Sequence, residues 1–279
     1  MLRTSAVRVL DDRDRDDVRA LLRVDPVADV FVAARVQGRL DPWRLGAELW
    51  GYGERGRLES LCWSGANLIP VQAGPRAVRA FADRARRQGR RCSSLVGPQE
   101  QVGPLWELLE PAWGPAREVR ADQPLMVVDG PPAVPSDPYV RPVRMDELDT
   151  LLPACIAMFT EEIGVSPLAG DGQAAYRARV RELVSQGRAF ARLDGGRVVF
   201  KAEVGAVAGG VCQVQGVWVD PALRGRGLSE AGMAAVVELS RARVAPVVSL
   251  YVNDFNTPAR RAYERVGFRR VGTFTSVLF

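Results

Sequence analysis

Residues 215–229 read Gln215-Gly216-Val217-Trp218-Val219-Asp220-Pro221-Ala222-Leu223-Arg224-Gly225-Arg226-Gly227-Leu228-Ser229. The apolar first part predicts a strand that ends at Asp220, and a helical period begins after Gly227. Glycines let a ligand approach the backbone closely, and the first amides of a helix have no acceptor within the helix. The stretch therefore predicts a strand, a loop and a helix start that bind phosphate oxygens, with added charge from Arg224 and Arg226.

Other nucleotide-binding loops do not fit this stretch. It has no Gly-Lys-Ser or Gly-Lys-Thr, so it is not a P-loop, and it lacks the Gly-x-Gly-x-x-Gly pattern of dinucleotide folds. A plain solvated turn that caps a helix remains the alternative interpretation for residues 224–229.

A second motif follows at a fitting distance. Residues 250–268 read Leu250-Tyr251-Val252-Asn253-Asp254-Phe255-Asn256-Thr257-Pro258-Ala259-Arg260-Arg261-Ala262-Tyr263-Glu264-Arg265-Val266-Gly267-Phe268. Asn256 or Thr257 predicts a helix N-cap, with a proline in the first turn. One helix and one strand fit between Gly227 and Asn256.

The two motifs together resemble the acyl-CoA-binding region of the GNAT superfamily of N-acyltransferases. Arg224, Gly227 and Ser229 stand at the three defined positions of its Gln/Arg-x-x-Gly-x-Gly/Ala loop, where Ser229 departs from the pattern but remains small and keeps its amide. The Asn, Ala, Tyr and Gly-Phe spacing of the second motif also resembles this family. The resemblance covers residues 139–279.

The chain divides into two similar parts at a proline-rich segment, residues 130–138, which cannot continue a helix or a central strand. Each part opens with a short strand and an acid-started amphipathic helix, at residues 7–22 and 140–159. We therefore expect an α/β fold of two tandem GNAT-like domains, each a mostly antiparallel twisted sheet flanked by helices. The domains would be residues 1–129 and 139–279, joined by the linker.

The first part lacks the glycine–arginine loop. Where residues 217–229 would align it reads Asn67-Leu68-Ile69-Pro70-Val71-Gln72-Ala73-Gly74-Pro75-Arg76-Ala77, and Trp106 replaces the tyrosine. It is interpreted as a degenerate domain without an acyl-CoA motif, serving either as an acceptor-site wall or as a scaffold. The whole resembles tandem-GNAT proteins of actinobacterial type, with an architecture similar to that of mycothiol synthase.

The resemblance implies transfer of an acyl group, most simply acetyl from acetyl-CoA, to a primary amine of a small molecule, peptide or protein by direct attack. A catalytically weak acyl-CoA-binding regulatory module is the alternative. Residues expected to bind the acyl-CoA lie on the strand end, the loop and the next helix start: Val217, Trp218, Val219, Arg224, Gly225, Arg226, Gly227, Leu228, Ser229 and Asn256.

Tyr263 is expected to protonate the departing thiolate, although an aromatic on an amphipathic helix can also be a core residue. The base is open. Gln213 and Gln215 stand where many family members have a glutamate, and an amide cannot take a proton at neutral pH. Candidate bases, acting through water, are the carboxylates Glu161, Glu162 and Glu203; the first two could instead attract a cationic amine, and any of them could be a surface or ion-paired carboxylate.

Composition narrows the chemistry further. The 279 residues contain no histidine, which excludes Ser-His-Asp and Cys-His triads and HExxH metal sites. The four cysteines, Cys62, Cys92, Cys155 and Cys212, form no CxxC pair and are expected to be buried apolar residues. No metal is expected.

The net charge of +5 favours anionic ligands, and nearly all of it is arginine, since Lys201 is the one lysine. Basic residues alternate with acidic ones, so a nucleic-acid-associated protein is a weaker third interpretation. Residues Met1–Thr4 run into a charged segment, and no apolar stretch is long enough for a membrane span. We expect a cytoplasmic monomer or homodimer whose partners are acyl-CoA and an amine acceptor, without membrane association.

Overall fold

The computed structural model of the chain describes residues 7–38, 40–168 and 172–279. Residues Met1–Thr4, on which the expectation of a cytoplasmic protein partly depends, lie outside this range. The chain forms two compact units. Unit 1 comprises residues 1–125, 251–254 and 270–279, and unit 2 comprises residues 126–250 and 255–269.

Unit 1 contains a mixed sheet in the order β1-β2-β3-β4-β5-β12. Its strands are β1 (Arg8–Val9), β2 (Glu48–Glu54), β3 (Arg57–Ser64), β4 (Asn67–Val71), β5 (Ser94–Pro98) and most of β12 (Arg269–Leu278). All neighbours pair antiparallel except β4 and β5, which are parallel. The β2–β3 ladder runs from Glu48 opposite Ser64 to Glu54 opposite Arg57. Strand β6 (Glu118–Val128) follows, and most of it belongs to this unit.

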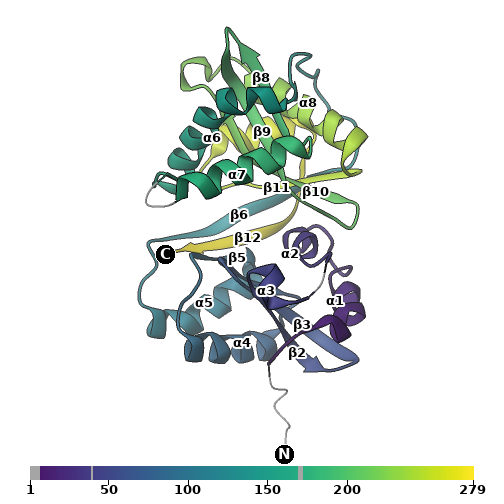
Figure 1. Ribbon diagram of the computed structural model, residues 1–279, viewed down its shortest axis with the longest axis vertical. Coiled ribbons are helices and arrows are strands. Elements are labelled where there is room, and N and C mark those ends of the chain that lie inside the picture. Colours follow the sequence, from purple (N-terminus) through teal and green to yellow (C-terminus); the bar gives the residue numbers. More distant parts are fainter. Residues whose placement is uncertain (1–6, 39, 169–171) are drawn as a thin grey trace, which may run out of the picture. The chain divides into compact units, whose positions relative to one another are not determined.

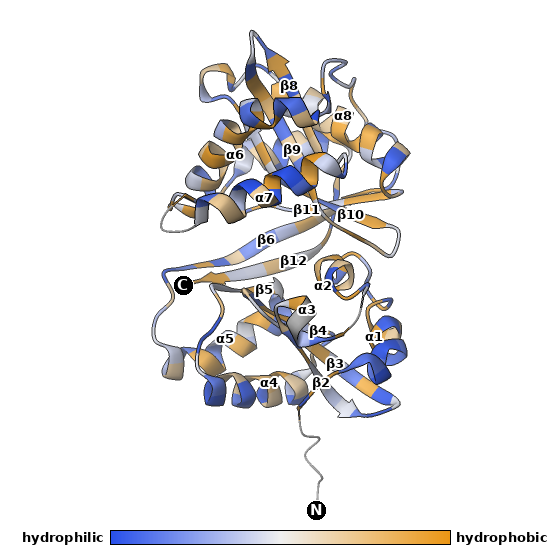
Figure 2. Ribbon diagram, viewed as in Figure 1, coloured by the Kyte–Doolittle hydropathy of each residue, from blue (hydrophilic) through white to orange (hydrophobic). Residues whose placement is uncertain are grey.

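Helices cover both faces of this sheet (Figure 1). They are η1 (Asp12–Asp14), α1 (Arg15–Leu21), α2 (Val30–Arg35), α3 (Pro42–Leu45), α4 (Pro75–Gln88) and α5 (Gln99–Trp113). Successive strand residues point to opposite faces, so Leu61 and Trp63 pack in the core under α1 and α2, whereas Cys62 packs under α4 and α5. Hydrophilic and hydrophobic residues alternate along α4 and α1, as amphipathic helices require (Figure 2).

Unit 2 repeats the plan. Its sheet has the order β11-β10-β9-β8-β7. The strands are β7 (Arg141–Pro142), β8 (Ala189–Asp194), β9 (Arg197–Ala208), β10 (Val211–Val219) and β11 (Val247–Tyr251). Only β10 and β11 pair in parallel. The helices are η2 (Met145–Glu147), α6 (Leu148–Ile163), α7 (Gly172–Ser185), η3 (Pro221–Leu223), α8 (Leu228–Arg243) and α9 (Thr257–Val266).

The sequence predicted these elements closely. Two tandem α/β domains are present in the chain, each a mixed, mostly antiparallel sheet flanked by helices, and the strand predicted to end at Asp220 is β10, whose last residue is Val219. The helix after Gly227 begins at Leu228. All four cysteines are free and buried, as predicted. No helix among the described residues is both long and apolar enough to cross a lipid bilayer.

The last strand of the chain is the main difference from a simple succession of domains. Strand β12 pairs antiparallel with β5, with Thr275 opposite Gly97, so the C-terminal strand belongs to unit 1. Residues 130–138 contain neither helix nor strand. The predicted domains, residues 1–129 and 139–279, follow the repeat in the sequence, whereas the compact units follow contacts in space. The predicted domain boundaries remain a prediction.

A buried carboxylate at the start of α2 contacts the turn after β4. Asp29 is 2% exposed and accepts a hydrogen bond from Gln72 Nε2 at 2.9 Å. Gln72 has a φ of 50°, the one positive φ outside glycine among the described residues. Burial raises the pKa of Asp29 to about 7, although the Gln72 hydrogen bond opposes the shift. Asp29 therefore holds its proton more tightly in the folded chain than in the unfolded one.

Asp29 should make stability fall with rising pH. Its stabilising contribution is complete below the unfolded pKa, near 4, and is lost as the pH rises through about 7. We expect Asp29→Asn to be more stable than the wild type at pH 8 by on the order of 3 kcal/mol, with little difference at pH 4. Urea unfolding of both proteins across this range measures the difference, and parallel stability curves would contradict the shifted pKa.

Candidate active site

The candidate site lies where β10 separates from β11. The two strands pair only from Val211 opposite Val247 to Gln213 opposite Ser249, while β10 continues to Val219. Residues along β10 change from buried to half-buried after Val214. The second half of the strand, which includes residues 217–219, therefore offers backbone groups with no partner on β11.

Strand β10 is also irregular on its other side. Its register against β9 shifts between Gln215 and Trp218, where Gly216 adopts a φ of 59°. A Cβ at Gly216 would lie 2.9 Å from Met158 Cε and 3.2 Å from both Glu203 Cδ and Lys201 Nζ. Glycine is needed here for its backbone conformation and for the close approach of these side chains.

A buried ion pair lies under this bulge. Lys201 and Glu203 are two residues apart on β9, so both point to the same face, and their Nζ and Oε2 atoms are 3.1 Å apart. Glu203 also accepts a hydrogen bond from Gln215 Nε2 at 2.9 Å, and Lys201 Nζ lies 3.4 Å from Cys155 Sγ. Their exposures are 1% and 7%, so water does little to stabilise either charge.

The two charges hold one another in the ionised state. Burial favours the neutral acid, but the Lys201 charge and the Gln215 hydrogen bond outweigh it and keep the pKa of Glu203 below its ordinary value. Burial likewise opposes the ammonium, yet Glu203 and Cys155 raise the pKa of Lys201. A carboxylate with a lowered pKa and a fixed cation is a weak proton acceptor, which argues against Glu203 as the base.

The loop after β10 presents free backbone amides. Gly225 and Gly227 both have a φ of 77°, and a Cβ at either would meet no atom within 4 Å, so their glycines are required by conformation and not by space. Gly227 is the N-cap of α8 and has no side chain to cap it. Within the described chain, the N–H groups of residues 225–227 donate to no other group. Together with the first amides of α8, at Leu228 and Ser229, they form a site suited to an anion.

Arg224 turns back from the loop toward α6. Its Nη2 lies 2.7 Å from Glu161 Oε2, and its Nε donates to the carbonyl of Val219. Trp218 Nε1 donates to the other oxygen of Glu161 at 3.1 Å. Both charged side chains are almost half exposed, so the pair contributes at most about 1 kcal/mol. Arg226 is exposed beside it.

Helix α9 places Tyr263 in the core of unit 2. Tyr263 is 6% exposed and packs against Phe268, with ring centroids 5.9 Å apart. Its hydroxyl makes no hydrogen bond to any described residue, which leaves it available to a ligand. Burial raises the pKa of Tyr263, and the charge of Glu162 raises it further. Asn256 caps the helix by accepting a hydrogen bond from Ala259 N, as predicted.

The structure thus groups the predicted residues into three sets. Glu161 joins Trp218 and Arg224, Glu162 acts on Tyr263, and Glu203 is engaged with Lys201. Lys201, Cys155 and Gln215 form a cluster around Glu203 that no sequence motif predicted. The available signal was a lone lysine two residues from a glutamate in an otherwise apolar strand. No cluster of three or more metal-ligating side chains is present among the described residues.

The corresponding turn of unit 1 is closed by the protein itself. The amide of Ala73 donates to Gln101 Oε1 at 2.9 Å, and Pro75, the first residue of α4, has no amide to offer. Gln72 is engaged with Asp29. These contacts support the interpretation of the first half as a domain without an acyl-CoA loop.

A diverging strand that leads through a glycine–arginine loop to a helix start is the arrangement that carried the resemblance to the GNAT superfamily. Comparison with known families agrees: residues 165–268 match the Acetyltransferase (GNAT) family, so unit 2 contains a GNAT domain. Residues 47–151 match a domain of unknown function, DUF4081. No curated protein matches the chain.

Solved structures resemble the whole chain. A GCN5-related N-acetyltransferase from Sphaerobacter thermophilus is 17% identical over 100% of this chain and 96% of its own, with a TM-score of 0.58. A GCN5-related N-acetyltransferase from Kribbella flavida is 17% identical over 91% and 94%, with a TM-score of 0.58. A Drosophila protein reaches a TM-score of 0.65 at 14% identity, over 99% of each chain. These likenesses establish the fold.

The buried ion pair can be tested by a double-mutant cycle. Lys201→Met leaves the Glu203 charge buried without its cation, and we expect a loss of about 3–5 kcal/mol in the free energy of unfolding. Adding Glu203→Gln removes that charge, so the double variant should be more stable than Lys201→Met alone. Denaturant unfolding of the four proteins measures the coupling. Additive effects would show that the two side chains do not interact in the folded chain.

Proposed function

We propose that the protein is an acyl-CoA-dependent N-acyltransferase that transfers an acyl group, with acetyl as the expected one, to a primary amine. The observation that carries this proposal is the set of amides at residues 225–227 that donate to no described group, in the loop that follows a strand diverging from its neighbour. The GNAT family match of residues 165–268 supports acyl transfer from acyl-CoA as the general reaction.

The described residues fit an acyl-CoA. The loop amides and the N-terminus of α8 would hold the pyrophosphate, and Arg224 and Arg226 would add charge. Because the exposed contact of Arg224 with Glu161 is weak, phosphate oxygens can replace it. Backbone groups of residues 217–219 would bind the pantetheine arm, and one amide there would polarise the thioester carbonyl. Asn256 completes the proposed set from the start of α9.

Two proton transfers are needed, because the amine must lose a proton and the departing sulfur must gain one. Tyr263 is the proposed acid: its hydroxyl is without a partner, and its raised pKa keeps it protonated. Among the candidate bases, Glu203 is neutralised by Lys201 and Glu161 is engaged with Arg224. Glu162 is proposed as the base, through water, because its charge acts on Tyr263, the proposed acid; alternatively, it attracts a cationic amine.

A regulatory module that binds acyl-CoA without efficient turnover is the second candidate. The observation that favours it is the absence of a free carboxylate on the central strands, where Glu203 is ion-paired and positions 213 and 215 hold glutamines. Both candidates require the same binding loop, so only turnover separates them.

Gly227→Asp should abolish acyl-CoA binding. The aspartate adds a negative charge where the pyrophosphate would lie and forces a side chain into a left-handed backbone conformation. We expect the affinity for acetyl-CoA to fall at least about a hundredfold in calorimetric titration, from one site per chain. Gly196→Asp is the matched control, since Gly196 has a φ of 75°, open space around it and a place in the distant β8–β9 turn. Equal binding by both variants would refute the proposed loop.

Tyr263→Phe should lower kcat by about a hundredfold without weakening acetyl-CoA binding, because it removes one proton donor and keeps the aromatic ring. Steady-state assays with a panel of primary amines measure this. Tyr139→Phe is the control, since Tyr139 is 68% exposed and contacts Arg192 elsewhere in unit 2. Unchanged kcat in Tyr263→Phe would exclude the tyrosine as the acid, and tight binding without turnover of any amine would favour the regulatory module.

A further inference from the structure

Unit 1 contains a polar cavity far along its sheet from the turn that corresponds to the acyl-CoA loop. The cavity has a volume of about 420 Å³ and opens where β2 begins and β3 ends. It lies beside the last turn of α4, whereas the turn after β4 leads to the first turn of this helix. The cavity is therefore not a remnant of the acyl-CoA site. Its lining residues are Pro42, Gly46, Ala47, Glu48, Ser64, Gly65, Ala66, Gln88 and Arg91.

One wall of the cavity is the Glu48 carboxylate, of which one oxygen is hydrogen-bonded and the other is not hydrogen-bonded to any described residue. Glu48 Oε2 accepts hydrogen bonds from Trp50 Nε1 at 2.7 Å and from Arg84 Nη2 and Gln88 Nε2 at 3.2 Å each. Its other oxygen, Oε1, makes no hydrogen bond with any described residue. The Trp50 hydrogen bond, followed by those of Gln88 and Arg84, keeps the pKa of Glu48 below its ordinary value, so the free oxygen is that of an ion.

This wall is rigid. The Arg84 guanidinium lies over the Trp50 ring at 5.0 Å from its centroid, so two of the three groups that hold Glu48 also contact each other. The cavity lining is also tightly packed at Gly65, where the Cβ of a larger residue would lie 2.9 Å from Ala47 Cβ and 3.0 Å from Trp63 Nε1. The Glu48 carboxylate is therefore preorganised before any ligand arrives.

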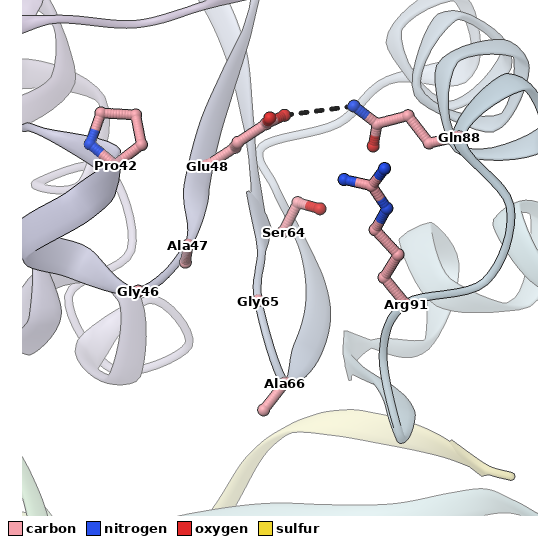
Figure 3. A pocket seen from close by; sticks show the side chains of 9 residues that line it. All are labelled: Pro42, Gly46, Ala47, Glu48, Ser64, Gly65, Ala66, Gln88 and Arg91. Atoms are coloured by element: carbon pink, nitrogen blue, oxygen red, sulfur yellow. Dashed lines mark hydrogen bonds between the residues drawn. The ribbon is translucent and has the colours of Figure 1, made fainter.

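The opposite charge in the cavity has no partner. Arg91, in the connection between α4 and β5, makes no ion pair or hydrogen bond with any described residue, and the Ser64 hydroxyl makes none either. Figure 3 shows the Arg91, Ser64 and Gln88 side chains directed into the same space as the Glu48 carboxylate. Since Arg84 already balances Glu48, Arg91 leaves the cavity with one uncompensated positive charge.

We propose that this cavity binds a small zwitterion of the α-amino acid class. The ligand carboxylate would bind Arg91 and Ser64, and the ligand ammonium would donate to Glu48 Oε1. The negative end of the α4 dipole, at Gln88, adds attraction for the ammonium. The volume is within the range of small-molecule pockets and suits a single amino acid or a dipeptide. The proposal concerns unit 1 and does not depend on acyl transfer by unit 2.

The experiment is calorimetric titration of the full chain with L-alanine, L-serine, L-glutamate and L-alanyl-L-alanine, each up to about 10 mM, a concentration that detects even millimolar binding. Propionate and ethylamine serve as probes that carry only one of the two charged groups. We expect saturable binding of at least one zwitterion and at least about tenfold weaker binding of both single-charge probes, because each loses a charge-assisted hydrogen bond.

Two variants assign the binding to the cavity. Arg91→Ala removes the carboxylate partner from an exposed position, and Glu48→Gln keeps an oxygen for the three donors but turns an amide NH₂ toward the ligand. Each should weaken binding at least about tenfold. Arg87→Ala is the matched control. Arg87 is an exposed arginine in the last turn of α4, four residues before Arg91, and it does not line the cavity. Thermal unfolding of each variant verifies that it is folded.

Two results would overturn the proposal. The first is an absence of saturable binding for every zwitterion. The second is binding that Arg91→Ala leaves as strong as in Arg87→Ala, which would locate the ligand elsewhere. Gly227→Asp should leave amino acid binding intact, so failure of this proposal is distinguishable from failure of the acyltransferase proposal.

Discussion

The buried charges of Lys201 and Glu203 constrain the candidate active site more than any other interaction. Neither charge is stable without the other at this depth, where an uncompensated ion costs several kcal/mol. Together they fill the space that a side chain at position 216 would need, so that position must be glycine. The bulge that this glycine permits interrupts the ladder to β9, which resumes at Trp218 opposite Lys201, and the half-buried part of β10 begins just before it. The backbone groups proposed to bind acyl-CoA follow directly.

The candidate site combines a buried ion pair, Lys201 with Glu203, and an exposed ion pair at its rim, Arg224 with Glu161. The contact of Arg224 with Glu161 has good geometry, but both side chains are nearly half exposed, so solvent screening makes it weak. In the proposed function, phosphate oxygens would replace the Glu161 carboxylate at little cost, whereas nothing from solvent can replace Glu203 at Lys201. The same pairing of an acidic and a basic side chain is therefore structural in the interior and, in this proposal, exchangeable at the rim.

Local patterns were sufficient to predict most of the fold. The β-branched run at residues 211–219 and the glycine before Leu228 determine the strand, the loop and the start of α8, because these depend on backbone preferences of neighbouring residues. The ion pair could not be derived in this way, since it depends on the register of β9 against β10 and on the cover of α6. The place of β12 was equally hidden, because its pairing with β5 joins segments far apart in the sequence, with Thr275 opposite Gly97. The contact between Glu161 and Arg224 joins residues 63 positions apart.

The two halves show how a fold outlasts its site. Unit 1 keeps the order of strands and helices, yet the turn after β4 differs from the loop after β10, because Gln101 takes the amide of Ala73 and Pro75 has none. A proline and one glutamine side chain thus remove two donors from the turn, while the buried apolar residues that hold the sheet and helices are present. Because the fold of unit 1 does not depend on the amides of this turn, charged residues such as Glu48 and Arg91 can lie elsewhere on its sheet without loss of the fold.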